Sequence, residues 1–259
     1  MRSYRSRRRV ISLFGGAMLT LLLGNAPVFG AELIVAAAIS LEAPLSEAGR
    51  HFEDLHPGTR VYFTFGASSA MAAQVRAGAP IDILVSAAER IVDSLAEDGI
   101  VDASSRRPLV RNHLVVVVPA NEARHTIEKP LDLLAPEVAR IAIPIAAVPL
   151  GGYAREWLRG HALLDPISRR IVPTPHARAT LAAVENRHVD AAIVYATDAR
   201  NARGARIAFD IPEVEQPAIA YSAVVVTESR QPALAADLLA FLRSDEAARR
   251  FLDRGFTLP

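Results

Sequence analysis

Short apolar runs alternate with amphipathic segments along most of this chain, and the alternation predicts its secondary structure. A run such as Leu114–Val118 is typical of a strand buried on both faces, because it is short, continuous and β-branched. Strands are predicted over residues 33–38, 60–65, 81–85, 114–118, 141–143, 170–172, 191–195 and 219–226. Helices are predicted over residues 41–52, 71–77, 88–97, 130–134, 153–158, 178–184, 234–242 and 247–252. Strands that alternate with helices form βαβ units, so we predict an α/β fold with mostly parallel sheets flanked by helices.

The first 30 residues have a different pattern. Met1–Arg9 carries five arginines and no acid, and an apolar run and a small-residue stretch ending at Gly30 follow it. This is the layout of a signal peptide, and the apolar run is shorter than the roughly 20 residues that span a bilayer. We predict a signal peptide over residues 1–30, export by the Sec or the twin-arginine route, and a periplasmic protein without stable membrane insertion. An uncleaved membrane anchor is the alternative.

Charge and composition exclude several classes of protein. The chain has a net charge of +1, and removal of the five arginines leaves about −4 on residues 31–259, so the basic surface that favours nucleic acid is missing. There is no cysteine, which excludes disulfides, cysteine metal sites and a lipid-anchored cysteine. The seven histidines show no metal-ligand spacing, and no nucleophile elbow, phosphate loop or zinc-protease motif is present. We therefore predict no catalytic residue, no cofactor and no site for a bare metal ion.

Two serines occur where a predicted strand gives way to a predicted helix. Ser40 follows the strand over 33–38, and Ser68 follows the strand over 60–65. A helix N-terminus has unpaired backbone N–H groups and a partial positive charge, so it binds anions without a basic side chain. In an open α/β sheet two such ends converge on a crevice at the carboxyl edge of the strands. Each serine is also explained as an ordinary helix N-cap, and the pattern alone leaves both interpretations open.

Longer motifs surround these serines and continue toward the C-terminus. They are Ala36–Leu41, Phe65–Ser69 with Ala77–Asp82, Val148–Ala154, His176–Arg178, Ala192–Ala199 and Arg254–Thr257. Together they resemble the family of periplasmic molybdate-binding proteins, from about Leu33 to the C-terminus. The resemblance implies that the hydroxyls of Ser40, Ser68 and Tyr195 bind an oxyanion, molybdate or tungstate. It also implies backbone N–H contacts from Leu150 and Ala177.

The same resemblance implies the architecture and the partners. It predicts a two-lobed periplasmic-binding-protein fold of type II, with the ligand in the cleft between the lobes. One lobe would contain residues 31–111 plus 222–259, and the other residues 112–221. The protein would deliver its oxyanion to the membrane permease and ATPase of an ABC importer, and we expect it to be a monomer.

Two departures from the family pattern affect the predicted ligand. Leu150 stands where the family has a small alanine, and Pro175-His176 replaces a pair that is usually acidic or amide. A protonated His176 would add positive charge beside the anion. These changes leave sulfate or a small organic acid open as alternative ligands. An enzyme or a ligand-sensing domain on the same fold is a third interpretation, although the sequence shows neither a catalytic constellation nor a DNA-binding segment ahead of the lobes.

Overall fold

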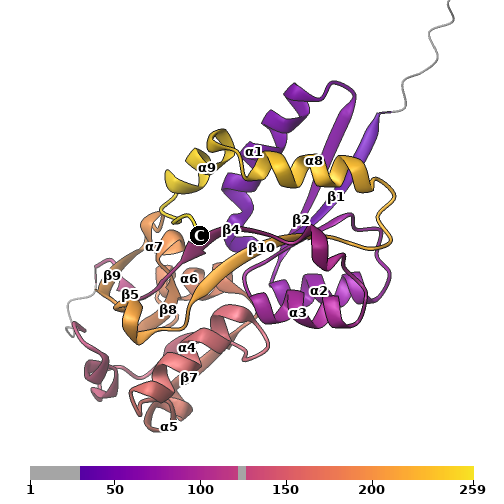
Figure 1. Cartoon of the computed structure of the whole chain (residues 1–259). Helices are drawn as coiled ribbons and strands as arrows, with labels where there is room; N and C mark the ends of the chain where they lie inside the picture. Colours follow the sequence, from indigo (N-terminus) through magenta and orange to yellow (C-terminus); the bar gives the residue numbers. More distant parts are fainter. Residues whose placement is uncertain (1–29, 122–126) are drawn as a thin grey trace, which may run out of the picture.

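The computed structural model describes residues 30–121 and 127–259. The predicted signal peptide, residues 1–30, lies outside the described residues except for Gly30. The chain forms two lobes, each built on a five-stranded sheet with helices on its faces (Figure 1). This confirms the two-lobed α/β fold that the sequence predicts. In the described ranges, no helix has both the length and the apolar character that a membrane crossing requires.

The sheet of the first lobe has the strand order β2-β1-β3-β10-β4. Its strands are β1 (Ala31–Ala38), β2 (Thr59–Gly66), β3 (Ile83–Ser86), β4 (Arg107–Asn112) and β10 (Ile219–Val225). β1 pairs in parallel with β2 and β3, whereas β10 is antiparallel to both β3 and β4. Only β10 is therefore reversed within this sheet, which agrees with the predicted mostly parallel arrangement.

Helices cover both faces of this first sheet. Those of the first lobe are α1 (Glu42–Leu55), α2 (Ser68–Arg76), α3 (Glu89–Glu97), α8 (Pro232–Leu242) and α9 (Asp245–Leu252). α1, α8 and α9 pack together on one face, and α2 and α3 pack on the other. Figure 1 shows the C-terminal helices, in yellow, beside the indigo α1, so the end of the chain returns to the lobe in which it began.

The sheet of the second lobe has the order β7-β6-β8-β5-β9. Its strands are β5 (Leu114–Pro119), β6 (Ile141–Pro144), β7 (Ile171–Thr174), β8 (Ala191–Tyr195) and β9 (Ala205–Asp210). Its helices are α4 (Pro149–Gly160), α5 (Leu164–Ile167), α6 (Ala177–Glu185) and α7 (Ala196–Arg200), and the predicted helix over 130–134 is a short 3-10 helix. β5 is the reversed strand here, antiparallel to β8 and β9.

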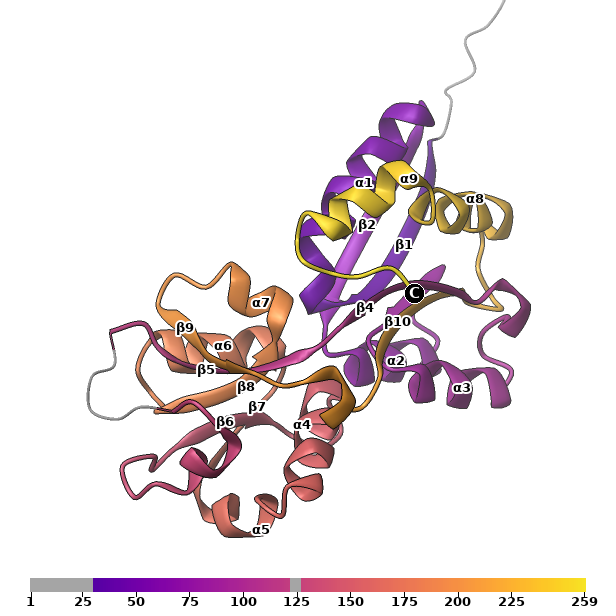
Figure 2. The ribbon, with the colours of Figure 1, turned by 60° about the vertical axis from the view of Figure 1, so that its left-hand side comes forward.

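The chain passes between the lobes twice (Figure 2). It leaves the first sheet at the end of β4 and enters β5 after His113, and it returns through residues 211–218 between β9 and β10. Asn112 and Ile219 pair at the start of this crossing. β4 therefore includes Asn112, and β10 begins at Ile219, so the first sheet extends slightly past the lobe limits predicted at 111 and 222.

Burial on both faces explains the continuous apolar runs. Along β5, Val115 and Val117 face the α6 side of the sheet, while Leu114, Val116 and Val118 face the other side. All five side chains are buried. An alternating pattern would have left one face polar, so the continuous run identified a central strand correctly.

Two strands, β4 and β9, were not predicted, because charged residues shorten their apolar runs. β4 and β9 are the last strands of their sheets, and each places charged residues such as Arg107 and Asp210 within the strand. Edge strands bury less surface, and their sequences lose the apolar signature. Several helices also begin earlier than predicted, and the largest differences are at α2 and α4, which begin at Ser68 and at Pro149. Proline suits the first position of a helix because its missing N–H has no partner there in any case.

The first turn of α4 packs closely on the end of β6, and we expect Gly151 to be required there. A Cβ atom at this position would lie within 3.0 Å of the carbonyl oxygens of Pro144 and Ile145. Gly151→Ala should therefore lower the melting temperature by several degrees, as an overpacked core position does. Gly152→Ala is the matched control, because its Cβ would meet the flexible end of Arg90 at 3.3 Å and the Ala146 carbonyl oxygen at an ordinary contact distance of 3.7 Å. Equal melting temperatures for the two variants would contradict the close packing.

Candidate functional site

A small cavity of about 20 Å³ lies between the two lobes. The first lobe lines it with Ala38, Ile39, Ser40, Gly66, Ala67, Ser68 and Ala87, and the second lobe with Val148, Pro149, Leu150, Ala177 and Tyr195. The residues that the sequence singled out, Ser40, Ser68, Leu150, Ala177 and Tyr195, all belong to this set. The fold thus brings together in one cavity residues that are dispersed along most of the chain.

Every lining segment follows the carboxyl end of a strand. Ser40 comes after β1, Ser68 after β2 and Ala87 after β3, and Leu150, Ala177 and Tyr195 come after or at the end of β6, β7 and β8. These strands are parallel within each sheet, so their carboxyl ends meet at one edge. The edges of the two sheets face each other across the cavity. This is where open α/β sheets place their ligands.

Three helices begin at the cavity wall. Ser68 and Ala177 are the first residues of α2 and α6, and Leu150 is the second residue of α4. The first backbone N–H groups of a helix have no partner within that helix and carry about half a positive charge together. Among the described residues that line the cavity, none has an ionisable acid or base except the Tyr195 phenol. The polar groups at the cavity are therefore helix ends and neutral hydroxyls, a set that suits an anion.

The Tyr195 hydroxyl is the most informative group in the cavity. The side chain is 2% exposed, and its oxygen has no hydrogen-bond partner in the described part of the chain. Burial is the main cause that raises the pKa of Tyr195 well above that of a free tyrosine, and the nearby Tyr221 adds to the rise. The group therefore remains an O–H donor. A buried donor without an acceptor costs about 1–3 kcal/mol. A ligand that offers an acceptor in this cavity removes that cost.

The two serines are not the helix caps that one interpretation of the sequence expected. Ser40 lies in a 3-10 turn, Ile39–Leu41, and α1 begins at Glu42 with no side-chain cap. Ser68 lies inside the first turn of α2, after the residue in the cap position. The cap positions are occupied by Ala38 before the 3-10 turn and by Ala67 before α2, and neither has a hydroxyl, so the N-cap interpretation is wrong for both serines.

The serine hydroxyls are instead fixed by longer-range hydrogen bonds. Ser68 Oγ accepts the Ala87 N–H at 3.0 Å, which leaves its own proton free to point into the cavity. Ser40 Oγ lies 3.0 Å from the Tyr221 hydroxyl. Asn112 Nδ2 donates to that same hydroxyl at 3.3 Å and to Thr197 Oγ1 at 2.9 Å. This network was not visible in the sequence, because its members are separated by up to 181 positions.

His176 has a role that the sequence did not suggest. Its Nδ1 accepts the Ala179 N–H at 3.1 Å, so the side chain caps α6, and it is not among the cavity-lining residues. Leu150, the other departure, is fully buried and part of the core around the cavity. Both departures from the family pattern therefore lie at the edge of the site, His176 as the cap of α6 and Leu150 as a buried wall residue.

Further contacts join the lobes around the cavity. Arg178 of α6 pairs with Glu42 of α1, with Nη1 and Oε2 2.5 Å apart. Tyr153 of α4 donates a hydrogen bond from its hydroxyl to the Ala87 carbonyl at 3.1 Å. The structure therefore represents the lobes closed on each other. Arg178 serves this interface and does not line the cavity.

Comparison with known proteins identifies the family. The model of the bacterial extracellular solute-binding proteins matches residues 33–257. The chain belongs to this family. It is similar to the molybdate-binding protein ModA of Escherichia coli, with 31% identity over 97% of this chain and 99% of the relative. It is also similar to ModA of Haemophilus influenzae, with 30% identity over 93% of this chain and 96% of the relative.

Solved structures agree with this assignment. The substrate-binding domain of a molybdenum ABC transporter from Clostridium difficile has a TM-score of 0.69 and 26% identity, and covers 88% of this chain and 99% of its own. The periplasmic molybdate-binding protein of Azotobacter vinelandii has a TM-score of 0.77 and 22% identity, over 88% and 99% of the two chains. This second likeness establishes the two-lobed fold of the solute-binding protein.

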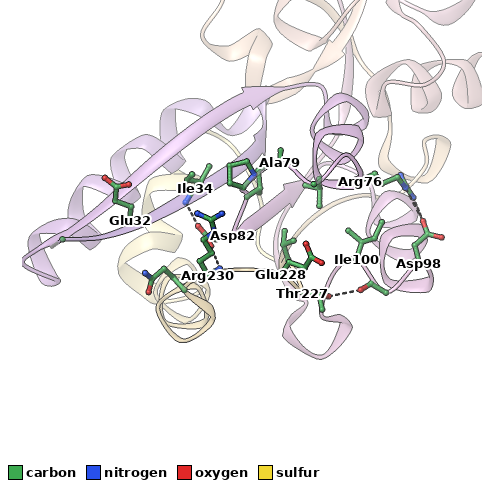
Figure 3. Close-up of a pocket in the computed structure, with 18 residues that line it drawn as sticks. Glu32, Ile34, Arg76, Ala79, Asp82, Asp98, Ile100, Thr227, Glu228 and Arg230 are labelled. Atoms are coloured by element: carbon green, nitrogen blue, oxygen red, sulfur yellow. Dashed lines mark hydrogen bonds and ion pairs between the residues drawn. The ribbon is translucent and has the colours of Figure 1, made fainter.

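A larger groove of about 870 Å³ lies at the opposite end of the first lobe of this solute-binding protein (Figure 3). It is formed around the amino ends of β1 and β3. Asp82 accepts hydrogen bonds there from the Ile34 N–H at 2.8 Å and from the Ser229 hydroxyl at 2.7 Å. Arg76 pairs with Asp98 at 2.9 Å. Asp82, Arg76 and Asp98 therefore have partners within the chain, unlike the Tyr195 hydroxyl of the interlobe cavity.

Asp198 is a buried carboxyl behind the site of this solute-binding protein. It lies in the first turn of α7, and its Oδ2 has no hydrogen-bond partner among the described residues. Burial raises the pKa of Asp198 from 3.8 to about 7, and Arg178 opposes the rise only in part. The folded state therefore binds the proton more tightly than the unfolded state. The stability that this proton provides is present below about pH 4 and is lost as the pH rises through about 7.

We predict that Asp198→Asn removes this pH dependence. Relative to the unaltered protein, the variant should gain free energy of unfolding between pH 4 and pH 8, with an upper limit of about 4 kcal/mol at about 1.4 kcal/mol per pKa unit. Urea unfolding at several pH values measures the difference. Asp165→Asn is the matched control, because that aspartate is exposed on α5. A difference between variant and unaltered protein that is constant over this range would contradict the assignment.

Proposed function

We propose that this chain is the periplasmic binding component of an ABC importer and that it binds molybdate or tungstate in the interlobe cavity. The proposal depends on one observation, which is that the Tyr195 hydroxyl is buried in the cavity without a hydrogen-bond partner among the described residues, beside the starts of three helices. The family assignment and the similarity to the molybdate-binding ModA proteins support the same conclusion. Solute-binding proteins are not an enzyme class, and we propose neither a catalytic residue nor a cofactor.

The chemistry of the donors fits a fully deprotonated tetrahedral anion. Such an anion has four oxygens that accept hydrogen bonds and no proton to donate. The hydroxyls of Ser40, Ser68 and Tyr195 supply donors, and Leu150 and Ala177 supply N–H groups at helix starts. A protonated anion such as hydrogen phosphate would need an acceptor for its own proton. Sites built for one hydrogen-bond pattern reject another strongly, so phosphate should bind poorly.

The proposed anion would be bound by both lobes, which links binding to closure of the protein and so to transport. Ser40 and Ser68 come from the first lobe, and Leu150, Ala177 and Tyr195 from the second. An anion held from both sides stabilises the closed form over an open one, because only the closed form satisfies all the donors. The closed protein would then be the form that presents its cargo to a membrane permease driven by an ATPase. We propose that residues 1–30 direct export to the periplasm and that the protein acts as a monomer.

Calorimetry with four anions tests the proposed function. The purified protein should bind sodium molybdate and sodium tungstate with similar affinity, and should bind sulfate and phosphate much more weakly. Molybdate should also raise the melting temperature, since a ligand that binds only the folded state stabilises it. Tight binding of sulfate together with none of molybdate would establish the alternative anion. No heat and no thermal shift with molybdate or tungstate would overturn the proposal.

Substitutions at the donors should weaken binding without unfolding the protein. Ser68→Ala and Tyr195→Phe each remove one O–H donor to a charged ligand, which costs about 1–3 kcal/mol, or about five- to 150-fold in Kd. Titration calorimetry with molybdate measures the loss. Tyr62→Phe is the control for the tyrosine change, because Tyr62 is 52% exposed on β2. Wild-type affinity in both donor variants would show that these hydroxyls do not contact the anion.

A further inference from the structure

Tyr153 reaches across the interlobe cleft without entering the cavity. It belongs to α4 of the second lobe, three residues after Leu150, and its hydroxyl donates to the Ala87 carbonyl of the first lobe at 3.1 Å. Its ring also packs on the cluster that includes Met71 and Leu84, whose members all belong to the first lobe. Tyr153 is therefore a half-buried side chain of one lobe that packs against the other.

Ala87 connects this contact to the proposed anion site. It lies after β3 and lines the cavity, and its N–H donates to Ser68 Oγ at 3.0 Å. Two hydrogen bonds therefore hold Ala87, one from Tyr153 at its carbonyl and one to Ser68 at its N–H. The bond to Ser68 occupies an acceptor position of the hydroxyl and directs its proton elsewhere, toward the cavity. Neighbouring hydrogen bonds of this kind reinforce one another in a buried site.

The bond from Tyr153 depends on closure of the lobes. In an open form the hydroxyl and the Ala87 carbonyl would separate and each would bind water, whereas the bond between Ala87 and Ser68 lies entirely within the first lobe. Burial raises the pKa of Tyr153 to about 12, so the hydroxyl keeps its proton and remains a donor at neutral pH.

We propose that Tyr153 is a positioning residue of the oxyanion site, which locks Ala87 and through it Ser68 when the lobes close, and so slows release of the anion. This inference rests on the proposed function, because it assigns Tyr153 a part in binding the same ligand. One neutral hydrogen bond that exists only in the closed form corresponds to about a three- to tenfold change in the release rate. The association rate should change little, because encounter with the anion precedes closure.

The experiment measures molybdate binding and release by the full protein and by Tyr153→Phe. Phenylalanine keeps the ring that packs on the first lobe and removes only the hydroxyl. Stopped-flow measurement, with excess tungstate to trap released protein, should give release three- to tenfold faster than in the unaltered protein. The melting temperature without ligand should be unchanged. Tyr62→Phe, an exposed tyrosine on β2, is the matched control and should release at the unaltered rate.

A double-mutant cycle separates positioning from simple packing. If Tyr153 acts through Ser68, then Tyr153→Phe should have a smaller effect on molybdate affinity in a Ser68→Ala background than in the unaltered protein. If the fold-change in affinity of the double variant equals the product of the two single fold-changes, the inference is overturned. An unchanged release rate in Tyr153→Phe would also overturn it. Failure of the unaltered protein to bind molybdate would overturn the proposed function and this inference with it. Normal binding with unchanged release would overturn the inference alone.

Discussion

The site depends on one constraint, which is that a buried hydrogen-bond donor needs an acceptor. The Tyr195 hydroxyl is buried in the interlobe cavity without one, and the starts of α2, α4 and α6 surround it. These donors come from two lobes, so an internal acceptor from either lobe would satisfy only part of the set. In the proposed function, a small anion with several acceptor oxygens would satisfy them together, and would do so only when the lobes are closed.

The fold creates this constraint through strand direction. The carboxyl ends of the parallel strands in both sheets meet at the cavity, and the helix starts follow from that placement. Positive charge at the site comes from helix ends, while the arginine nearest by sequence, Arg178, is paired with Glu42 across the lobes. Burial raises the pKa of Asp198, in the first turn of α7, to about 7, so this carboxyl is partly neutral near pH 7. The pairing of Glu42 with Arg178 and the partial neutrality of Asp198 both reduce the repulsion of an anion by nearby carboxylates. Selection among anions then depends on hydrogen bonds.

Much of the fold and all of the proposed ligand residues were predictable from the sequence, but their interactions were not. Continuous apolar runs such as Leu114–Val118 identified the central strands, because both faces of those strands are buried. The family motifs predicted that Ser40, Ser68 and Tyr195 share one site, and all three line the interlobe cavity. The local sequence pattern could not predict hydrogen bonds between residues far apart in the chain. It suggested that the two serines cap helices, whereas Ser40 is paired with Tyr221 and Ser68 with Ala87. It also gave no signal for Tyr153, whose partner lies 66 positions away in the other lobe.

The most direct test of the central claim is the position of the bound anion. A crystal of the protein grown with molybdate, measured at the molybdenum absorption edge, locates the metal atom by its anomalous scattering. The account predicts a single strong peak inside the interlobe cavity, with the anion's oxygens within hydrogen-bond distance of Ser68 Oγ and the Tyr195 hydroxyl. A peak elsewhere, or an anion that leaves the Tyr195 hydroxyl without an acceptor, would contradict it.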